Sequence, residues 1–351
     1  MRELVALLAA LLQMGSGFSL TPSAPRPAPE RPVRLTVAAT GDLLIHTPVA
    51  QRALALGGGR RYDFAPLFRD VRRPIARADL ALSHVETPLV PGSVQGYPVF
   101  RTPPDLARSI RRVGWDACST ASNHSLDAGQ YGIGTTLRAL RSAGVKATGT
   151  ARSAAARRRT TMIRVKGIRV AFLSYTAVSN GQPMPHPWSV NWASPGAILR
   201  DARRARRRGA RLVIVNIHWG AEFVSAVTPQ QRALARRLTR SPAIDAIVGQ
   251  HVHVVQPIRR VRGKPVVFGE GNLISNQTAA CCPAASQDGL IALIDFVVRP
   301  GRPARARRIR YVPTWVRHPD YTVMRATPGS PSWNRTVATA GNRNGVRPLT
   351  K

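Results

Sequence analysis

Short apolar runs alternate with segments of helical spacing along most of the chain from Arg34 onward. Apolar runs bounded by Gly, Asn or Pro predict strands, and apolar positions that recur every three to four residues predict helices. The predicted strands are 34–40, 79–86, 116–123, 145–150, 160–165, 167–176, 210–220, 243–249, 255–261, 264–271 and 289–299. The predicted helices are 64–78, which Pro74 interrupts or kinks, 104–114, 131–144, 198–209 and 228–241.

This alternation predicts a layered α/β fold in which helices cover the faces of a sheet. Residues 160–165 and 167–176 are expected to pair as a hairpin across Lys166 and Gly167. The last three predicted strands follow one another without a helix, so we expect them to form a run of antiparallel strands. The sequence shows no internal repeat.

The two ends of the chain differ from its centre. Residues 1–20 contain the apolar run 4–12, which has the length of a signal-peptide core and is too short to span a bilayer. The alternative is a frayed apolar N-terminus. Residues 21–32 are rich in proline and predict an extended linker, and residues 318–351 predict a loose C-terminal tail. We therefore expect one domain over 33–317, in a protein that is secreted or attached to the cell envelope.

The chain is strongly basic, with 52 Lys and Arg against 17 Asp and Glu and a net charge of +35. Such a charge is compatible with nucleic acid, anionic wall polymers or a membrane surface as partners. Only four of the 52 are lysines, which also fits the coding bias of a GC-rich genome. We favour coding bias with some attraction to anions. No nucleic-acid-binding motif accompanies the charge, so no specific nucleic acid partner is expected.

Two histidines, His251 and His253, stand two residues apart in "VGQHVHVVQP", directly after a predicted strand. In an extended segment both side chains would point to the same side, and imidazole is the commonest metal ligand. The alternative is a pair of surface or hydrogen-bonded histidines. Residues able to bind metal also follow four other predicted strands: Asp42; Glu86; Asn123 with His124 and Asp127; and His218 with Glu222.

One polar residue after a strand is ordinary, because it commonly caps the next helix. Five strand ends that all carry oxygen or nitrogen donors are harder to explain as caps. In open α/β sheets the carboxyl ends of the strands share one crevice, so these groups are expected to converge. Carboxylate, amide and imidazole donors together suit Mn, Fe or Zn better than Ca. Their number suits two ions, which can clamp an in-line phosphoryl displacement when about 3.5–4 Å apart.

The order of these motifs resembles that of a known family. The motifs are "TGDLLIH", "ADLALSHVETPL", "GWDACSTASNHSLDAG", "VNIHWGAEF", "VGQHVHVVQPI" and "VFGEGNLIS". They resemble the bacterial capsule-synthesis protein CapA family, the poly-γ-glutamate capsule proteins, over about residues 33–298. That family is similar in fold to the calcineurin-like metallophosphatases. The resemblance therefore implies a layered α/β/β/α sandwich with a site for two divalent metal ions.

The resemblance also implies a role for each matching residue. Glu86 is expected to bridge the two metal ions, and His124 to donate a proton to a leaving group or to stabilise a phosphate. The full set of expected metal ligands is Asp42, Glu86, Asn123, His218, His251 and His253. Expected neighbours of the ligands or the substrate are His46, His84, Asp127, Glu222, Gln256 and Asn272.

The chain departs from the family pattern at two positions. His84 stands where the family usually has Asn, so it is either an extra ligand or a bulky neighbour of Glu86. The Asp-x-His pair of the metallophosphatases is missing, because His46 follows Asp42 by four residues. His46 either reaches the site from the next turn or caps a helix.

Two functions stay open from the sequence. The first is an exported metal-dependent hydrolase or transferase that acts on a phosphoester or an anionic envelope polymer, alongside other capsule-synthesis proteins at the membrane. The second is a non-catalytic scaffold subunit that binds the polymer, which fits the positive charge and the missing Asp-x-His pair. Fold analogy does not name the polymer.

Overall fold

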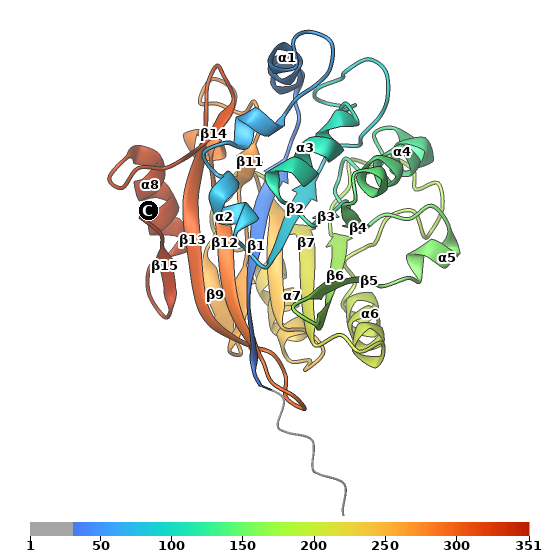
Figure 1. Ribbon diagram of the computed structural model, residues 1–351, viewed down its shortest axis with the longest axis vertical. Coiled ribbons are helices and arrows are strands. Elements are labelled where there is room, and N and C mark those ends of the chain that lie inside the picture. The colour runs from blue at the N-terminus through green and yellow to red at the C-terminus, as the bar shows by residue number, and fades with distance from the viewer. Residues whose placement is uncertain (1–30, 351) are drawn as a thin grey trace, which may run out of the picture. The chain divides into compact units, whose positions relative to one another are not determined.

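The computed structural model describes residues 31–350, which form two β-sheets (Figure 1). The first sheet has the strand order β14-β13-β12-β1-β2-β3-β4, with β11 paired to β1 and β15 to β13. Its strands are β1 (Val33–Leu43), β2 (Leu80–Val85), β3 (Ala117–Ser119), β4 (Lys146–Thr148), β11 (Asn272–Ile274), β12 (Asp288–Val298), β13 (Arg305–Arg317), β14 (Thr322–Arg325) and β15 (Val346–Pro348). The second sheet has the order β5-β6-β7-β8-β10-β9. Its strands are β5 (Thr161–Val165), β6 (Ile168–Thr176), β7 (Leu212–Trp219), β8 (Ala246–His251), β9 (Ile258–Val261) and β10 (Lys264–Val267).

The two sheets pack face to face around a shared apolar core. Successive side chains of a strand point to opposite faces, so every second residue enters this core. In β1, Val37 and Ala39 lie in the core between the sheets, whereas Ala38 belongs to the outer cluster. In β6, Phe172 lies between the sheets and Ala171 in the outer cluster on the other side. Both sheets are therefore apolar on both faces, and each outer face needs a cover.

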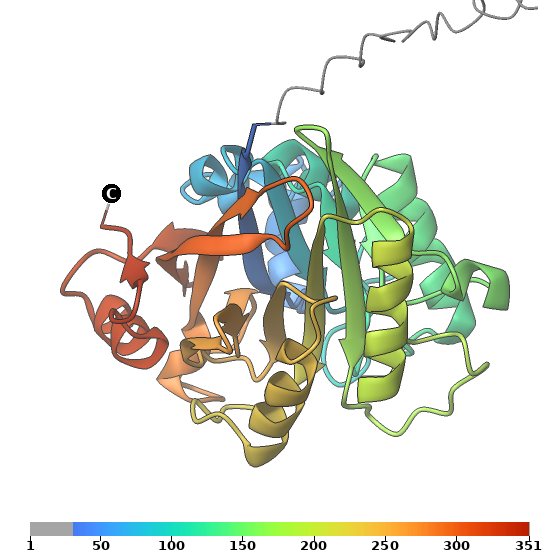
Figure 2. The same cartoon turned by 90° about the horizontal axis from the view of Figure 1, so that it is seen from below.

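Helices cover both outer faces, which gives the four layers α/β/β/α (Figures 1 and 2). The first sheet is covered by α1 (Thr47–Leu56), the 3₁₀ turn η1 (Ala65–Phe68), α2 (Arg72–Ala76), α3 (Asp105–Val113) and α4 (Gly129–Ser142). The second sheet is covered by α6 (Pro195–Arg207) and α7 (Pro229–Thr239). The remaining helical elements are α5 (Ala154–Arg157), the 3₁₀ turn η2 (Ala284–Gln287) and α8 (Pro331–Ala340). The predicted layered fold is confirmed.

Several local predictions are confirmed and others are wrong. The hairpin of β5 and β6 forms as predicted, with Lys166 and Gly167 both at positive φ, as a tight two-residue turn requires. The predicted helix 64–78 is instead divided into η1 and α2, and helix α1 was not predicted. The expected run of antiparallel strands is also divided, because β9 and β10 belong to the second sheet while β12 pairs with β1 in the first. These apolar runs are alike, so their pattern does not specify a sheet.

The predicted loose C-terminal tail is wrong. Residues 322–348 form β14, α8 and β15, and both strands pair with β13 (Figure 1). Val323, Ala340 and Val346 are buried against this side of the first sheet. The segment contains few apolar residues and many turn residues, so its ordering depends on contacts with β13 that periodicity does not reveal.

An ion pair joins α8 to the start of β12. Arg335 donates from Nε and from a terminal nitrogen to the two carboxylate oxygens of Asp288, at 2.6 and 2.9 Å, and Asp288 is 2% exposed. We expect Arg335→Met to lower the free energy of unfolding by about 2 kcal/mol, because a buried carboxylate loses its partner while the Arg side is partly solvated. Arg343→Met, at an exposed position, should change it by less than about 0.5 kcal/mol. Urea unfolding of both variants measures the difference, and equal effects would contradict an anchoring role for this pair.

The predicted signal peptide (1–20) lies outside the described residues, as does the linker (21–32) up to residue 30. Among the helices that the structure describes, none is long and apolar enough to cross a membrane.

Parallel pairing brings the predicted strand ends together. Strands β1, β2 and β3 are parallel in the first sheet, and β6, β7 and β8 in the second. Next to Asp42, the backbone of Gly41 packs so closely on Gly271 that a Cβ would lie 1.9 Å from its carbonyl oxygen. Only glycine fits there, and this close approach places Asp42 beside Asn272 of β11.

Candidate metal centre

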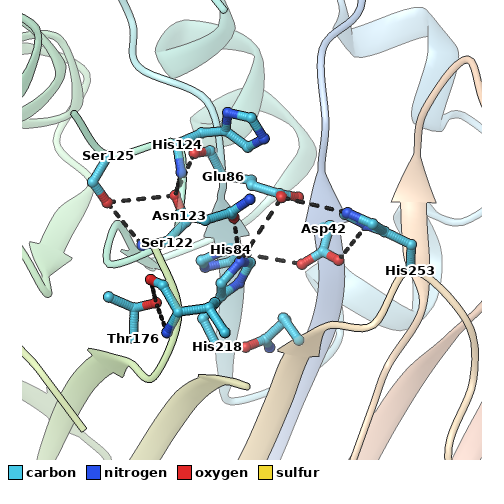
Figure 3. A network of polar contacts seen from close by, with 12 residues as sticks. Asp42, His84, Glu86, Ser122, Asn123, His124, Ser125, Thr176, His218 and His253 are labelled. Carbon is cyan, nitrogen blue, oxygen red and sulfur yellow. Dashed lines mark hydrogen bonds and ion pairs between the residues drawn. The ribbon is translucent and has the colours of Figure 1, made fainter. Parts of the chain in front are cut away.

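Two buried carboxylates face one imidazole where β1 and β2 end. Asp42 lies near the end of β1, Glu86 directly follows β2, and His253 follows β8. His253 Nδ1 lies 3.2 Å from Asp42 Oδ2, and His253 Nε2 lies 3.7 Å from Glu86 Oε1 (Figure 3). The three residues offer ligand atoms within 4.8 Å of one another. This is the first of three such groups in the described chain.

A second group contains Asp42, His84 and His218. His84 Nε2 lies 3.9 Å from Asp42 Oδ1, and His218 Nε2 lies 3.9 Å from Glu86 Oε1. Asn123 joins the group because its Oδ1 is 2.7 Å from His218 Nε2 (Figure 3). Asp42 therefore takes part in both groups, and Glu86 lies within 4 Å of imidazoles from both.

A third group contains Glu222, His251 and His253. The centroid of the His251 ring lies 4.7 Å from the centroid of the His218 ring and 6.1 Å from that of the His253 ring. Glu222 is exposed, whereas both histidines are buried. The structure thus brings together the six predicted ligands from five strand ends, and their role as ligands stays a prediction.

The chemistry of these donors fits divalent cations. Several buried polar atoms have no hydrogen-bond partner: both carboxylate oxygens of Asp42 and of Glu86, Nε2 of His84, and Nδ1 of His218 and of His251. An unpartnered buried carboxylate is costly, so this concentration of orphaned donors calls for a positive ligand.

Burial keeps two of the imidazoles neutral, as metal ligation requires. Burial lowers the pKa of His84 to about 4 and that of His251 to about 3, so both are neutral and can offer a lone pair. Burial raises the pKa of Glu86 well above its usual value, opposed by His253. Burial lowers the pKa of His253, but the carboxylates of Glu86 and Asp42 outweigh it and raise that pKa to about 9.

The turn after β3 is tied to the end of β2 by a serine. Ser122 Oγ donates to the backbone carbonyl of Glu86 at 2.7 Å and accepts the backbone N–H of His124 at 3.1 Å. Ser125 Oγ in turn accepts the N–H of Ser122 and donates to the carbonyl of Thr120, at 2.7 and 2.8 Å. These bonds set Asn123 and His124 at a fixed distance from Glu86 (Figure 3).

His124 is oriented by a carboxylate on one side of its ring. Its Nδ1 lies 2.8 Å from Asp127 Oδ2, which also accepts the backbone N–H of Phe100 at 2.7 Å. Gln182 donates to the other oxygen of Asp127 at 3.1 Å, and the Phe100 ring packs edge-on against the imidazole. A carboxylate that accepts a hydrogen bond from Nδ1–H leaves Nε2 available for proton exchange. His124 and Asp127 thus have the arrangement of an acid–base pair.

Sequence comparison assigns the chain to a family. The profile of the family described as "Bacterial capsule synthesis protein PGA_cap" matches residues 36–277, which include every residue of the three groups. The chain belongs to this family. As the resemblance implied, it is a member of the capsule-synthesis proteins related to CapA.

Two curated relatives match over part of their length. The chain is 31% identical to a "Probable polyglutamine synthesis accessory protein" of Mycobacterium tuberculosis strain H37Rv over 191 residues, which cover 50% of each chain. It is 25% identical to the "Capsule biosynthesis protein CapA" of Bacillus anthracis over 259 residues, which cover 70% of this chain and 60% of that protein. The chain thus spans about half of the first relative and less than two thirds of the second.

Among solved structures, a "novel phosphatase" from Mycoplasma pneumoniae superposes with a TM-score of 0.50 and 10% sequence identity, over 81% of this chain and 94% of that one. This likeness concerns the fold alone. The shared fold is a layered α/β sandwich, as the resemblance implied.

The predicted neighbours of the ligands differ in where they lie. Asn272 contacts a predicted ligand, because its Oδ1 is 3.0 Å from His253 Nδ1. Gln256 contacts the loop after β7 instead of a predicted ligand. Its side chain donates to the carbonyl oxygens of Val224 and Ala226, and these bonds hold the loop that contains Glu222. His46 belongs to none of the three groups.

The capping alternative for His46 is wrong, and His46 approaches the site only through Phe100. It occupies the N-cap position of α1, but its side chain makes no capping bond there. Its Nδ1 instead accepts the N–H of Asn276 at 3.2 Å, and burial lowers its pKa to about 4. Its ring packs edge-on against Phe100, which also contacts His124.

The histidine pair reaches the site by a different route from the one predicted. The segment is not extended, because β8 ends at His251, and both His251 and His253 have positive φ, at 92° and 55°. Positive φ is uncommon for residues other than glycine and costs about 1–3 kcal/mol per residue. The turn, rather than strand alternation, therefore directs both imidazoles into the site.

Three polar residues at the site were missed by the sequence analysis. Asn180 accepts from Asn123 Nδ2 at 3.0 Å and lies 3.3 Å from His124 Nδ1. Gln250 donates at 2.6 Å to the fully buried Glu270, and burial together with repulsion from Asp42 raises the pKa of Glu270. Asn180 follows strand β6, so the rule that found the other strand ends could have found it. The motif "VFGEGNLIS" contains Glu270 but offers no spacing signal for a partner in β8.

Ser119 determines which nitrogen of His84 faces the site. Its hydroxyl donates to the carbonyl of Ser83 at 3.2 Å and can accept from His84 Nδ1 at 2.7 Å, which leaves Nε2 unprotonated toward Asp42. We expect Ser119→Ala to weaken Mn²⁺ binding by about 10–100-fold, the usual cost of losing a partner that orients a ligand. Ser83→Ala is the matched control, because the buried Ser83 hydroxyl bonds nothing in residues 31–350. Isothermal titration with Mn²⁺ measures the affinity of both variants. Equal affinities of Ser119→Ala and Ser83→Ala would show that metal binding does not depend on the tautomer of His84 that Ser119 selects.

Proposed function

We propose that this chain is a divalent-metal-dependent hydrolase or transferase that cleaves or transfers a phosphoester group during assembly of an anionic envelope polymer. The proposal rests on one observation: unpartnered buried carboxylates and neutral imidazoles lie together beside the His124–Asp127 pair. Family membership supports the link to capsule synthesis. We further propose that the protein acts outside the cytoplasm, alongside other capsule-synthesis proteins at the membrane.

The residues that would hold two ions, Mn, Fe or Zn, are those of the three groups together with Asn123. When bound, such ions polarise a phosphoryl oxygen and lower the pKa of water. Glu86 can reach both ions, because imidazoles of two groups lie within 4 Å of it. Asn272 keeps His253 oriented toward Asp42 and Glu86.

His124 is the proposed general acid. Asp127 holds its Nδ1, so that Nε2 can give a proton to the oxygen of a departing group. Leaving oxygens of high pKa need this proton most. Phe100, packed edge-on against the imidazole, limits ring rotation and keeps water from one side of it.

The rim of the site offers few cations for substrate recognition. The connections at this edge are 44–46, 86–104, 120–128, 149–153, 177–194, 220–228, 252–257 and 275–287, and Arg101 and Arg152 are the two Arg or Lys in them. An anionic substrate would therefore be recognised within the site, by His124 and the metal-binding residues, rather than by a cationic rim.

Elemental analysis combined with a phosphodiester assay tests the proposal. Purified protein should hold about two equivalents of Mn, Fe or Zn and hydrolyse bis(p-nitrophenyl) phosphate, with activity lost in chelator and restored by Mn²⁺. Protein that binds metal but hydrolyses no phosphoester, or that binds none, would contradict it. If such protein still binds poly-γ-glutamate, the non-catalytic scaffold is the better description.

A further inference from the structure

In the connections between strands and helices, cations are concentrated at the edge opposite the metal centre. The connections that precede the parallel strands or join strands at that edge are 77–79, 114–116, 143–145, 166–167, 208–211, 240–245, 262–263 and 299–304. Although short, they contain eight Arg or Lys, namely Arg77, Lys166, Arg208, Arg211, Arg240, Arg262, Arg299 and Arg302. The longer connections around the metal centre contain two, Arg101 and Arg152. Coding bias alone would spread arginine over both edges, so the polarity needs another explanation.

A group of these cations lacks acidic partners. Arg262 lies in the β9–β10 turn, Arg299 and Arg302 in the β12–β13 turn, and Arg305 at the start of β13. All four are exposed and line one depression, and none has a carboxylate within 4.0 Å in residues 31–350. The one acid that lines this depression, Asp245, is 4% exposed and paired with Arg206 at 2.5 Å. The four arginines therefore present uncompensated charge to solvent.

The same edge receives the start of the fold. Strand β1 begins at Val33, paired with Val298 directly before the β12–β13 turn. Figure 1 shows the beginning of β1 and this turn at the lower end of the molecule, away from α1. The sequence that precedes this point contains the apolar run 4–12. The described fold therefore begins at the edge that carries the uncompensated arginines.

We propose that this metal-distal basic edge, defined by Arg262, Arg299, Arg302 and Arg305, docks on an anionic lipid bilayer. The buried acids Asp42 and Glu86 lie at the opposite ends of β1 and β2. The charge asymmetry thus runs along the strands and turns the basic edge toward a negative surface. In this orientation the metal centre points away from the bilayer. The cations lie in turns of both sheets, an arrangement that suits an extended charged surface better than a single strand of polymer.

Vesicle binding of the full chain tests the proposal. Wild type should bind vesicles that contain 30% phosphatidylglycerol in phosphatidylcholine, and binding should weaken as salt is raised. Each Arg or Lys near an anionic bilayer contributes about 1 kcal/mol to binding, which corresponds to about a fivefold increase in the partition coefficient. Replacing the four arginines of the metal-distal basic edge by Gln should therefore reduce partition several-hundredfold.

The control replaces the same number of exposed arginines elsewhere, namely Arg52, Arg60, Arg61 and Arg138 by Gln. This control variant has the same net charge as the edge variant, and its partition onto vesicles should stay within about threefold of wild type. Thermal melts confirm that both variants fold, and pure phosphatidylcholine vesicles report any contribution of the apolar run.

Three results would overturn the proposal: equal losses in both variants, wild-type binding that does not depend on phosphatidylglycerol, or vesicle binding unchanged in the edge variant. If the edge variant loses binding to soluble poly-γ-glutamate while vesicle binding persists, the edge binds polymer instead. None of these results depends on phosphoesterase activity, so the proposed function can fail while the docking surface stands.

Discussion

Glu86→Gln should lose most of the bound divalent metal, with affinity for Mn²⁺ reduced by at least about 10³-fold. Glu86 lies within 4 Å of His218 and His253, which belong to different ligand groups, so its carboxylate can serve both ions. Two divalent cations about 4 Å apart would repel by on the order of 15 kcal/mol even at an effective dielectric of about 20. Removing the charge between them leaves that repulsion uncompensated. Elemental analysis after gel filtration, with isothermal titration for affinity, measures the loss.

Two comparisons distinguish this effect from general damage. Glu222→Gln removes an equal charge from an exposed member of the third group and should reduce affinity by about tenfold or less. The Glu86→Gln protein should remain folded without metal, because Gln has the same size and burial already favours the neutral acid at this position. A Glu86→Gln protein that retains both ions while Glu222→Gln loses them would show that the bridging position has been assigned to the wrong residue.

The convergence of the site could be predicted because it depends on topology. Parallel strands bring their carboxyl ends to one edge of a sheet, so Asp42, Glu86 and Asn123 had to meet once β1, β2 and β3 were identified correctly. His218 comes from the second sheet, and the packing of the two sheets brings it to the same place. The identity of the donors then restricted the chemistry to divalent cations. Neither step required knowledge of side-chain conformation.

The role of His84 could not be settled from sequence. Whether it acts as a ligand or as a bulky neighbour depends on its tautomer, and that depends on Ser119 in the adjacent strand. The turn at His251 and His253 was equally hidden, because nothing in "QHVHV" signals positive φ without glycine. Such strained backbone is held by surrounding structure, so it is a property of the fold rather than of the local sequence.

The divided run of late strands shows a different limit. The segments of β10 and β12 are both continuous apolar runs, because each strand is covered on both faces. Periodicity distinguishes one buried face from two, but it does not specify which of two sheets receives a strand. The tail beyond Arg317 was misread for a related reason, since β14 and β15 are short and take their order from β13.

His124→Gln should keep the metal and lose turnover. His124 belongs to none of the three ligand groups, so metal content should stay within about 20% of wild type. As a general acid it would contribute about 10²–10⁴-fold to the rate. Asp127→Asn should lower the rate by about 10²-fold, because the amide no longer accepts the Nδ1–H bond with a full charge and the imidazole loses its fixed tautomer.

The decisive measurement is the dependence of rate on the leaving group. A p-nitrophenolate departs without a proton, whereas an alkoxide requires one. His124→Gln should therefore slow hydrolysis of a dialkyl phosphate, whose leaving group is an alkoxide, far more than hydrolysis of bis(p-nitrophenyl) phosphate. A purely structural role for His124 would slow both substrates equally. Equal losses with unchanged metal content would therefore remove His124 as the acid and leave it as a group that binds phosphate. Loss of metal in His124→Gln would instead place its imidazole among the ligands, and Asp127 would then be the residue that orients a ligand.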